Sequence, residues 1–219
     1  MNKTKIEWCD ATLNPVVGCK RGCPYCYAKR LNDRFGFIKK WDEPQFFPER
    51  LKALESKKPT VFFMDSMSDI EYWSDEAWKE TMVAIEKHWQ HRYIFLTKYF
   101  VAFTIRPFLD GKIVFQGKSI THQYELPKFN TFDFFSIEPI LESIRIISLA
   151  GIENLKAVIV GAETGNRQGK VVPRKEWIDA LVKDCDELHI PIFMKNSLKE
   201  LMGEEFRQDE LPWYKGLQK

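Results

Sequence analysis

The most informative stretch of this 219-residue sequence is Gly-Cys-Lys-Arg-Gly-Cys-Pro-Tyr-Cys-Tyr, residues 18–27. Three cysteines, Cys19, Cys23 and Cys26, follow one another in it with the spacing C-x3-C-x2-C. Thiolates this close in sequence can converge on one metal centre, and neighbouring glycines let a loop fold back so that its amide groups approach the sulfurs. The spacing therefore predicts a metal-binding loop.

The number of ligands indicates which metal centre this is. A structural zinc site normally takes four ligands, and the nearest further cysteine, Cys9, lies ten residues upstream. Three cysteines on a [4Fe-4S] cluster hold three irons and leave the fourth open for a small molecule. Three plainer alternatives stay open: a disulfide with a spare thiol, a zinc knuckle completed elsewhere in the fold, and a redox-inert buried loop. Cys9 and Cys185 are expected to be reduced core thiols.

The composition is that of an ordinary folded domain. Hydrophobic residues make up 44% and charged residues 29%, so we expect one domain over residues 1–219. The 33 basic and 31 acidic residues leave a net charge of +2, which gives no global argument for nucleic-acid or membrane binding. The start of the sequence lacks a signal-peptide pattern, and no run of about twenty apolar residues follows. We therefore expect a cytoplasmic protein with no membrane partner.

Short apolar runs alternate with helical patterns along the chain. Each run ends in polar, charged or glycine residues, which is typical of the carboxyl ends of strands in a parallel sheet. Strands are expected at residues 14–17, 61–64, 93–96, 112–115, 132–137, 157–160 and 191–194, and helices at 24–35, 75–91 and 177–189. Because a complete eight-fold barrel needs about 250 residues, the sequence predicts an α/β fold with an incomplete parallel barrel.

The cysteine spacing resembles that of the radical S-adenosylmethionine (SAM) superfamily. The resemblance implies a (β/α)6-type partial TIM barrel and a [4Fe-4S] cluster on the three cysteines. It also implies that the cluster binds SAM and cleaves it reductively to a 5'-deoxyadenosyl radical, with an electron donor such as flavodoxin or ferredoxin. An aromatic residue beside the adenine is usual there, and Tyr25 matches it. Lys20 and Arg21 would place positive charge near an anionic cluster.

A second resemblance, to the phage Gp37/Gp68 family, also called DUF5131, spans nearly the full length. It rests on residues 6–8, 10–12, 14–16, 18–19, 66–69, 96–98, 138–139, 158–161 and 163–165. The chain departs from the family at Cys9, where Thr is frequent, and at Leu13, where Trp is frequent. The Gly-Gly-Glu that the superfamily usually has after its second strand is replaced by Met-Asp-Ser at residues 64–66.

The ends of the expected strands supply the candidate SAM-binding residues. SAM carries an amino group, a carboxylate, a ribose diol and an adenine, and each needs a short polar side chain or a free backbone group. Asp65 and Ser66 are expected to accept from the amino group, and Ser119 to meet the carboxylate or the ribose. The backbone near Gly161 is expected to approach the adenine. A structural role as a cap or turn is the alternative for each.

Glu138, Glu163 and Lys195 are the candidate catalytic residues. A carboxylate at the carboxyl end of a strand, facing the mouth of a barrel, is a common site position, and simple solvent exposure is the alternative. Lys98 and Lys195 are expected to pair with these carboxylates. The four histidines have no spacing typical of a metal site, so we expect them at the surface or in caps.

These observations favour a radical SAM enzyme that acts on an unknown substrate, with nucleic acid and protein both possible. The alternative is a non-catalytic iron-sulfur module that senses redox state or binds nucleic acid. A third hypothesis is a partial-barrel phosphoesterase that uses Asp65, Asp69 and Glu138 on a metal.

Overall fold

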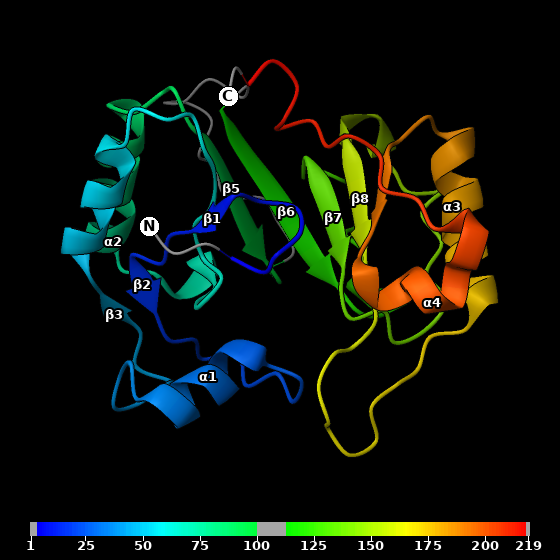
Figure 1. Cartoon of the computed structure of the whole chain (residues 1–219), viewed down its shortest axis with the longest axis horizontal. Helices are drawn as coiled ribbons and strands as arrows, with labels where there is room; N and C mark the ends of the chain where they lie inside the picture. The colour runs from blue at the N-terminus through cyan, green and yellow to red at the C-terminus, as the bar shows by residue number, and fades with distance from the viewer. Residues whose placement is uncertain (1–3, 100–112, 218–219) are drawn as a thin grey trace. The chain divides into compact units, whose positions relative to one another are not determined.

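The computed structural model describes residues 4–99 and 113–217, and the chain divides into two compact units (Figure 1). The first unit consists mainly of residues up to Thr97, and the second mainly of Gln116–Lys215. The expectation of a single domain over residues 1–219 stays a prediction.

The first unit contains three parallel strands that are neighbours in the order β1, β4, β5. They are β1 (Ala11–Thr12), β4 (Val61–Phe63) and β5 (Arg92–Thr97). The strand expected at residues 14–17 is wrong as a member of this sheet, because β2 (Val16–Val17) pairs antiparallel with β3 (Gln45–Phe46). Pro15 lies between β1 and β2 and has no N–H for a strand ladder, which explains why the chain leaves the parallel sheet there.

The helices of the first unit are α1 (Tyr27–Phe35) and α2 (Asp75–Glu86), with 3₁₀ helices η1 (Pro48–Glu55) and η2 (Ile70–Tyr72). Ser74 caps α2, since its hydroxyl accepts from the backbone N–H of Ala77 over 3.2 Å. The helix expected to reach residue 91 ends at Glu86 instead. Trp89, which extends the apolar pattern in sequence, is 73% exposed and belongs to the turn before β5.

One histidine contradicts the expectation of surface or capping positions. His91 is fully buried, and its ring lies 5.0 Å from the ring of Phe62 and 6.1 Å from that of Tyr93, centroid to centroid. Its Nε2 is 3.0 Å from the carbonyl oxygen of Leu54. Burial lowers the pKa of His91 below its ordinary value, so the ring is held neutral. His122 does cap a helix, η3, as expected.

The second unit contains four parallel strands that are neighbours in chain order. They are β6 (Val114–Ile120), β7 (Phe134–Ile137), β8 (Ala157–Val160) and β9 (Ile192–Met194). Every residue of β6, β7 and β8 is buried, as expected for parallel strands covered on both faces. The strand expected at 112–115 begins at Val114 and runs five residues further; residue 112 lies outside the described residues.

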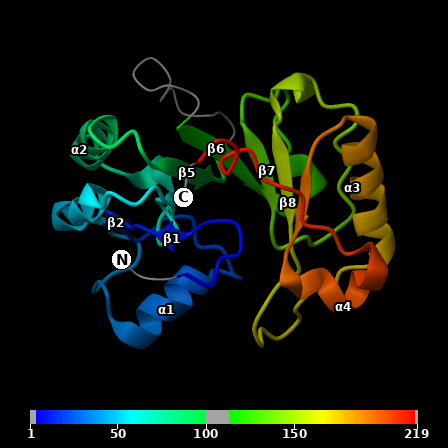
Figure 2. The same cartoon turned by 45° about the horizontal axis from the view of Figure 1, so that its top comes forward.

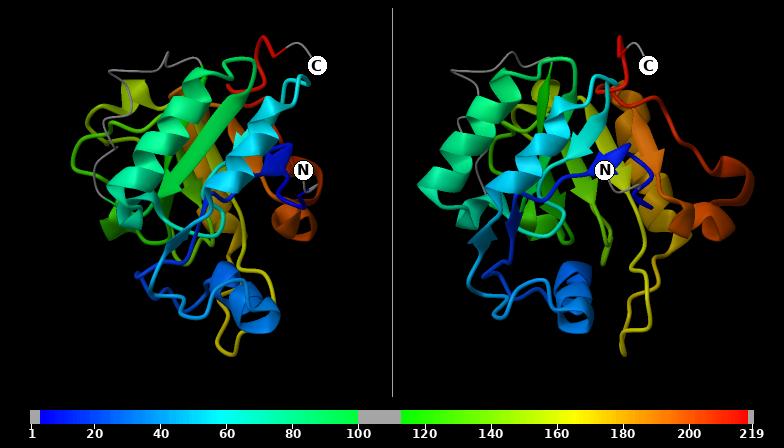
Figure 3. Two further views of the ribbon diagram at one scale, coloured as in Figure 1. Left: turned by 90° about the vertical axis from the view of Figure 1, so that its left-hand side faces the viewer. Right: turned by 60° about the vertical axis from the view of Figure 1, so that its left-hand side comes forward.

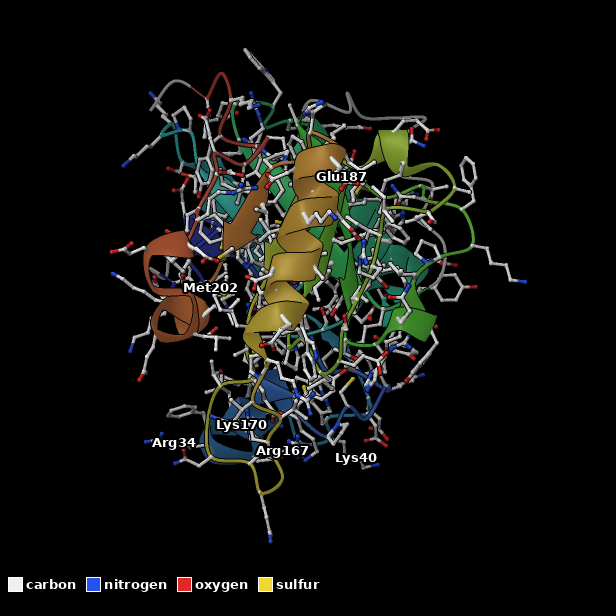
Figure 4. The ribbon with its side chains drawn as sticks, turned by 90° about the vertical axis from the view of Figure 1, so that its right-hand side faces the viewer. Arg34, Lys40, Arg167, Lys170, Glu187 and Met202 are labelled. Carbon is white, nitrogen blue, oxygen red and sulfur yellow. The ribbon has the colours of Figure 1, made fainter. Side chains whose placement is uncertain are left out.

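Helix α3 (Lys175–Glu187) lies along these strands (Figure 2), and Glu187 marks its end in Figure 4. Ile178, Leu181 and Cys185 on its inner face are fully buried in one core with residues of β7 and β8. Burial raises the pKa of the Cys185 thiol to about 12, so this cysteine is an inert core thiol, as expected.

Short elements complete the second unit. They are α4 (Lys199–Met202) and the 3₁₀ helices η3 (Gln123–Glu125), η4 (Ile152–Asn154), η5 (Asn196–Leu198) and η6 (Gly203–Glu205). Across residues 4–99 and 113–217, none of the helices combines the length and the apolar character needed to cross a membrane.

Candidate metal centre and strand-end residues

The cysteine loop, residues 18–26, connects β2 to α1 (Figure 3, blue). At its start, the N–H of Gly18 donates to the carbonyl of Met67 over 2.9 Å, and the N–H of Cys19 donates to that of Trp41 over 2.8 Å. Gly18 has φ of +112°, and a Cβ there would lie 2.8 Å from the Trp41 carbonyl oxygen and 2.9 Å from Cα of Pro44. Only glycine fits, so the path of the chain into Cys19 is fixed by close backbone packing.

The last cysteine of the loop is also the N-cap of α1. The Sγ of Cys26 accepts from the backbone N–H of Lys29 over 3.3 Å. The helix expected from residue 24 therefore begins at Tyr27, because Cys26 takes the capping position. Its expected end at Gly36 is confirmed, with φ of +66° and an N–H that donates to Asn32.

The three loop cysteines have the chemistry that an iron-sulfur cluster needs. None of the five cysteines, all of which lie in the described part of the chain, forms a disulfide, which contradicts the disulfide alternative. Cys19, Cys23 and Cys26 are partly exposed, whereas the other two are buried. The N–H of Arg21 donates to the Sγ of Cys19 over 3.5 Å. Soft thiolate ligands with backbone N–H groups aimed at the sulfurs are typical of cluster sites. The residues fit a cluster in their donor chemistry.

Without a metal, Cys19 is a neutral thiol. Burial, together with the nearby Asp69, Cys23 and Cys26, raises its pKa to about 12, while the hydrogen bond from the Arg21 N–H opposes this rise. Metal binding would have to displace this proton. Among the residues that the structure describes, no three His, Cys, Asp or Glu side chains are already grouped to hold a metal ion. The fit therefore rests on donor chemistry and not on a preformed metal geometry.

Arg21 fastens the cysteine loop to η2. Its Nη2 forms an ion pair with Glu71, and its Nε lies 3.8 Å from Oδ2 of Asp69. Asp69 in turn caps η2 through the N–H of Glu71 and accepts from the hydroxyl of Thr97 over 2.7 Å. The positive charge that the sequence places beside the three cysteines is thus shared with two carboxylates.

Asp65 and Ser66 both lie just after β4, as expected, but they are held differently. The carboxylate of Asp65 is buried and accepts from the N–H of Leu96 over 3.1 and 3.2 Å. Burial raises its pKa well above its ordinary value, and the charge of Asp69 adds to this. Ser66 donates its hydroxyl to Oδ1 of Asn14 over 3.0 Å.

In the second unit, three adjacent strand ends bring together Glu138, Gly161 and Lys195. They follow β7, β8 and β9, respectively, and Nζ of Lys195 forms an ion pair with Oε1 of Glu138, as expected. The two side chains are 15% and 25% exposed, for Lys195 and Glu138. A Cβ on Gly161 would lie 3.1 Å from Cδ of Lys195. The missing side chain at residue 161 therefore makes room for the lysine that reaches Glu138.

Glu163 and Ser119 are both buried. Arg167 donates two hydrogen bonds to the carboxylate of Glu163. Its Nε and Nη2 lie 2.6 and 2.8 Å from the two carboxylate oxygens. Arg167 is labelled in Figure 4, on the segment between β8 and α3. Ser119 lies inside β6, in register with Ser136 of β7, and so belongs to the sheet itself.

A protein-family model described as "protein of unknown function (DUF5131)" matches residues 3–206. This chain belongs to the DUF5131 family. Two structures of spore photoproduct lyase have similar folds: a cysteine-to-serine mutant, at 14% identity and a TM-score of 0.54, and a complex with dinucleoside spore photoproduct, at 13% and 0.52. Each match covers 89% of this chain and 79% of the other. No match is found among curated proteins.

At such low identity the likeness shows the fold alone. It confirms the expected incomplete parallel (β/α)6-type partial TIM barrel for this DUF5131 chain. Two residues at the site were not predicted: Asn14, whose Oδ1 also accepts from the N–H of Met67 over 2.9 Å, and Arg167. An Asn-Pro pair at a turn signals the first, and the Glu-x3-Arg spacing signals the second.

Proposed function

We propose that this DUF5131 protein is a radical SAM enzyme whose [4Fe-4S] cluster is held by Cys19, Cys23 and Cys26. One observation carries the proposal: three partly exposed cysteines with the C-x3-C-x2-C spacing, none of them in a disulfide, share one loop, and backbone N–H groups donate to two of them. The likeness in fold to spore photoproduct lyase supports it.

When bound, the cluster supplies an open iron for the amino and carboxylate groups of SAM, and one electron that cleaves SAM to a 5'-deoxyadenosyl radical. The chain's part is to hold the ligands. Gly18 fixes the start of the cysteine loop, the Arg21–Glu71 pair ties its middle to η2, and Cys26 joins its end to α1. A loop held at three points keeps its thiols available at low entropic cost.

In the first unit, Tyr25 and Ser66 have the proposed SAM-binding roles. Tyr25 lies between the last two cysteines and is assigned to the adenine, where an aromatic ring stacks favourably. The hydroxyl of Ser66 donates to Asn14, so its lone pairs are available to accept from the SAM amino group. Asp65, whose carboxylate accepts from Leu96, is assigned a supporting role that fixes the end of β4 beside β5.

In the second unit, Glu138 and Lys195 have the proposed catalytic roles, because their ion pair places a carboxylate and an ammonium at adjacent strand ends. Glu163 is also proposed as catalytic. It forms an ion pair with Arg167, so its proposed role is that of a carboxylate paired with this arginine. Ser119 is assigned to the carboxylate or ribose of SAM. Gly161 is assigned to the adenine, which its backbone would approach. The missing side chain at Gly161 also leaves the space that Lys195 occupies.

The experiment that tests this function is anaerobic reconstitution of the full chain with iron and sulfide. We expect about four irons per chain, and a change in the EPR spectrum of the reduced protein when SAM is added. Dithionite should then yield 5'-deoxyadenosine, measured by liquid chromatography. Cys19→Ala, Cys23→Ala and Cys26→Ala should each lose the cluster, and Cys9→Ala and Cys185→Ala serve as matched controls because both thiols are buried away from solvent.

The outcomes separate the hypotheses. If the EPR spectrum of the reduced protein did not change when SAM is added, a non-catalytic iron-sulfur module would be favoured. Loss of iron in Cys185→Ala as complete as in Cys23→Ala would indicate a fourth thiolate and no open iron, which would overturn the enzyme proposal. Phosphoesterase activity that survives Cys19→Ala would favour the third hypothesis.

The proposed setting is the cytoplasm, where free thiols persist. The proposed partners are SAM, a nucleic-acid or protein substrate, and a donor such as flavodoxin or ferredoxin. The phage Gp37/Gp68 designation is part of the proposal. Comparing modified macromolecules in cells with and without the protein would identify the substrate.

A further inference from the structure

Helix α1, which begins at the proposed cluster ligand Cys26, carries an apolar stripe on its exposed side. Tyr27, Leu31 and Phe35 are four residues apart and so lie on one face, and Phe37 follows just beyond the helix. All four are between 38% and 57% exposed. Single exposed apolar residues are ordinary, but a contiguous set indicates an interaction site.

The stripe is not what packs α1 onto the first unit. A different side of the helix, with Ala28 and Asn32, is buried. Ala28 lies in a small core with Val17, Ile38 and Met67. Asn32 fixes the chain after the helix, because its side chain donates to the carbonyl of Ile38 and accepts from its N–H, over 3.1 and 2.9 Å. The packed side of the helix is therefore separate from the stripe, from which the Tyr27 hydroxyl donates a hydrogen bond to the carbonyl of Ser66.

Two arginines border the stripe and give it a positive edge. Arg30 and Arg34 are exposed, and over the described residues neither has a carboxylate partner. Lys29, on another side of the helix, is by contrast neutralised by Asp33 at 2.8 Å. The guanidinium of Arg34, labelled in Figure 4, lies 5.0 Å from the ring centroid of Phe35.

We propose that this α1 face, formed by Tyr27, Leu31, Phe35 and Phe37 with Arg30 and Arg34, docks an acidic electron-carrying protein. The proposal rests on the proposed function. A carrier seated on α1 lies beside Cys26, so the electron has a short path: the carrier is oxidised by one electron and the cluster is reduced by one. Aromatic and arginine side chains are the usual anchors of interfaces, and unpaired arginines select a negatively charged partner.

A protein partner suits this surface better than a nucleic acid does. Single-stranded nucleic acids stack their bases on open aromatic faces. Here Arg34 lies over the ring of Phe35, and the hydroxyl of Tyr27 is tied to the carbonyl of Ser66 over 2.7 Å. Leu31, in the middle of the stripe, offers no ring at all.

The test uses the full chain and purified flavodoxin as the probe. The first variant reverses the charge of the face with Arg30→Glu and Arg34→Glu, and the second removes its apolar part with Leu31→Ser and Phe35→Ser. The matched control makes the same change in net charge at two exposed positions, with Lys79→Glu on α2 and Lys87→Glu just after it. Affinity for flavodoxin is measured by surface plasmon resonance at several salt concentrations, and circular dichroism checks folding.

We expect both variants of the face to bind flavodoxin at least tenfold more weakly than wild type, and the control to bind it as wild type does. Binding should weaken with salt in wild type and lose most of that dependence in the charge-reversed variant. In the reconstituted enzyme, the charge-reversed variant should make 5'-deoxyadenosine at the wild-type rate with dithionite but at least tenfold more slowly with reduced flavodoxin.

Several results would overturn the docking proposal. One is equal flavodoxin affinity in wild type and both variants. Another is a wild-type dimer that the face variants convert to monomers, which would assign the face to a second copy of the chain. A third is that both variants of the face lose the binding to a labelled thymidine decamer that wild type shows, while they bind flavodoxin as wild type does. Failure of wild type to cleave SAM with dithionite would instead refute the proposed function, while the affinity measurement would still decide whether the face docks the carrier.

Discussion

The Sγ of Cys26 accepts a hydrogen bond from the backbone N–H of Lys29 over 3.3 Å, so a proposed cluster ligand is also the cap of α1. The two roles make different chemical demands. A cap needs an acceptor of suitable length, which a hydroxyl supplies as well as a thiol does. A cluster needs a soft thiolate, which a hydroxyl does not supply.

Substitution should therefore separate the two roles. Cys26→Ser should keep the stability of the chain and lose the cluster, because serine is a good N-cap and a poor iron ligand. Cys26→Ala should lose the cluster and in addition about 1 kcal/mol of unfolding free energy. Iron content after anaerobic reconstitution and urea unfolding of the metal-free proteins check this. Full iron content in Cys26→Ser would refute the ligand assignment, and equal stability of both variants would refute the cap.

Gly18 and Gly22 both have positive φ, but their surroundings differ. A Cβ at Gly18 would lie within 3 Å of Trp41 and Pro44 backbone atoms, whereas nothing lies within 4 Å of one at Gly22. Gly18→Ala should thus cost roughly 3 kcal/mol of unfolding free energy and reduce iron uptake. Gly22→Ala should cost only the backbone strain, about 1 kcal/mol. Urea unfolding of both variants measures this, and equal losses would show that packing around Gly18 is not what fixes the loop.

The parallel strands of the two units, β1 excepted, could be predicted because they are apolar runs with polar ends. The exception is instructive. Ala11–Thr12 forms β1 with only two residues, and its place beside β4 is secured partly by the Asp10 carboxylate, which accepts from the N–H of Val61 over 2.9 Å. A strand of two residues whose partners all lie about fifty-one residues away leaves no local pattern. The apolar run at residues 16–17 was the stronger local signal and belongs to another sheet.

Some contacts of the candidate site could be predicted from the types of residue at the strand ends, and others could not. The Lys195–Glu138 pair was predicted from strand ends, since neighbouring parallel strands bring their carboxyl ends together. The partners of Arg21, by contrast, are the N-cap of η2 and a residue of η2, some fifty residues on, and nothing in the sequence distinguishes Arg21 from Lys20 beside it. The burial of His91 was missed for the same reason: it depends on Leu54, Phe62 and Tyr93 from three separate elements.

The buried His91 should make stability depend on pH. Burial lowers its pKa from the ordinary value of 6.5, so below that pH the unfolded chain binds a proton that the folded chain does not. The unfolding free energy should therefore fall as the pH is lowered from 7 through 6.5 and below. His91→Gln should flatten this part of the profile. Urea unfolding between pH 5 and 8 measures it, and identical pH profiles for wild type and His91→Gln would contradict the prediction.

Gly161 should control the position of Lys195. A Cβ there would lie 3.1 Å from Cδ and 3.3 Å from Cβ of the lysine, so the lysine side chain would have to move by a few tenths of an ångström. We expect Gly161→Ala to lower the unfolding free energy by about 1 kcal/mol through overpacking, and to lower 5'-deoxyadenosine production without loss of iron. Gly216→Ala is the control: with φ of +71° and no atom within 4 Å of the added Cβ, it should lose stability through backbone strain but keep wild-type 5'-deoxyadenosine production. Wild-type activity in Gly161→Ala would show that the lysine tolerates displacement.

Glu138→Gln tests whether the carboxylate at the end of β7 takes part in the reaction. The amide can still accept a hydrogen bond from Lys195, so the fold and the cluster should be retained, with a loss of about 1 kcal/mol or less for a partly exposed ion pair. The negative charge is lost, however, and with it the ability to bind a cationic group or move a proton, which typically contributes at least a hundredfold to a rate. We therefore expect 5'-deoxyadenosine production with dithionite to fall at least tenfold while iron content stays at the wild-type level. Lys156→Met, which removes an ammonium that pairs with Asp133 elsewhere in the second unit, is the control for loss of an ion pair as such. If Glu138→Gln cleaved SAM at the wild-type rate, Glu138 would have a structural role only, and Lys195 would be bound to it for stability.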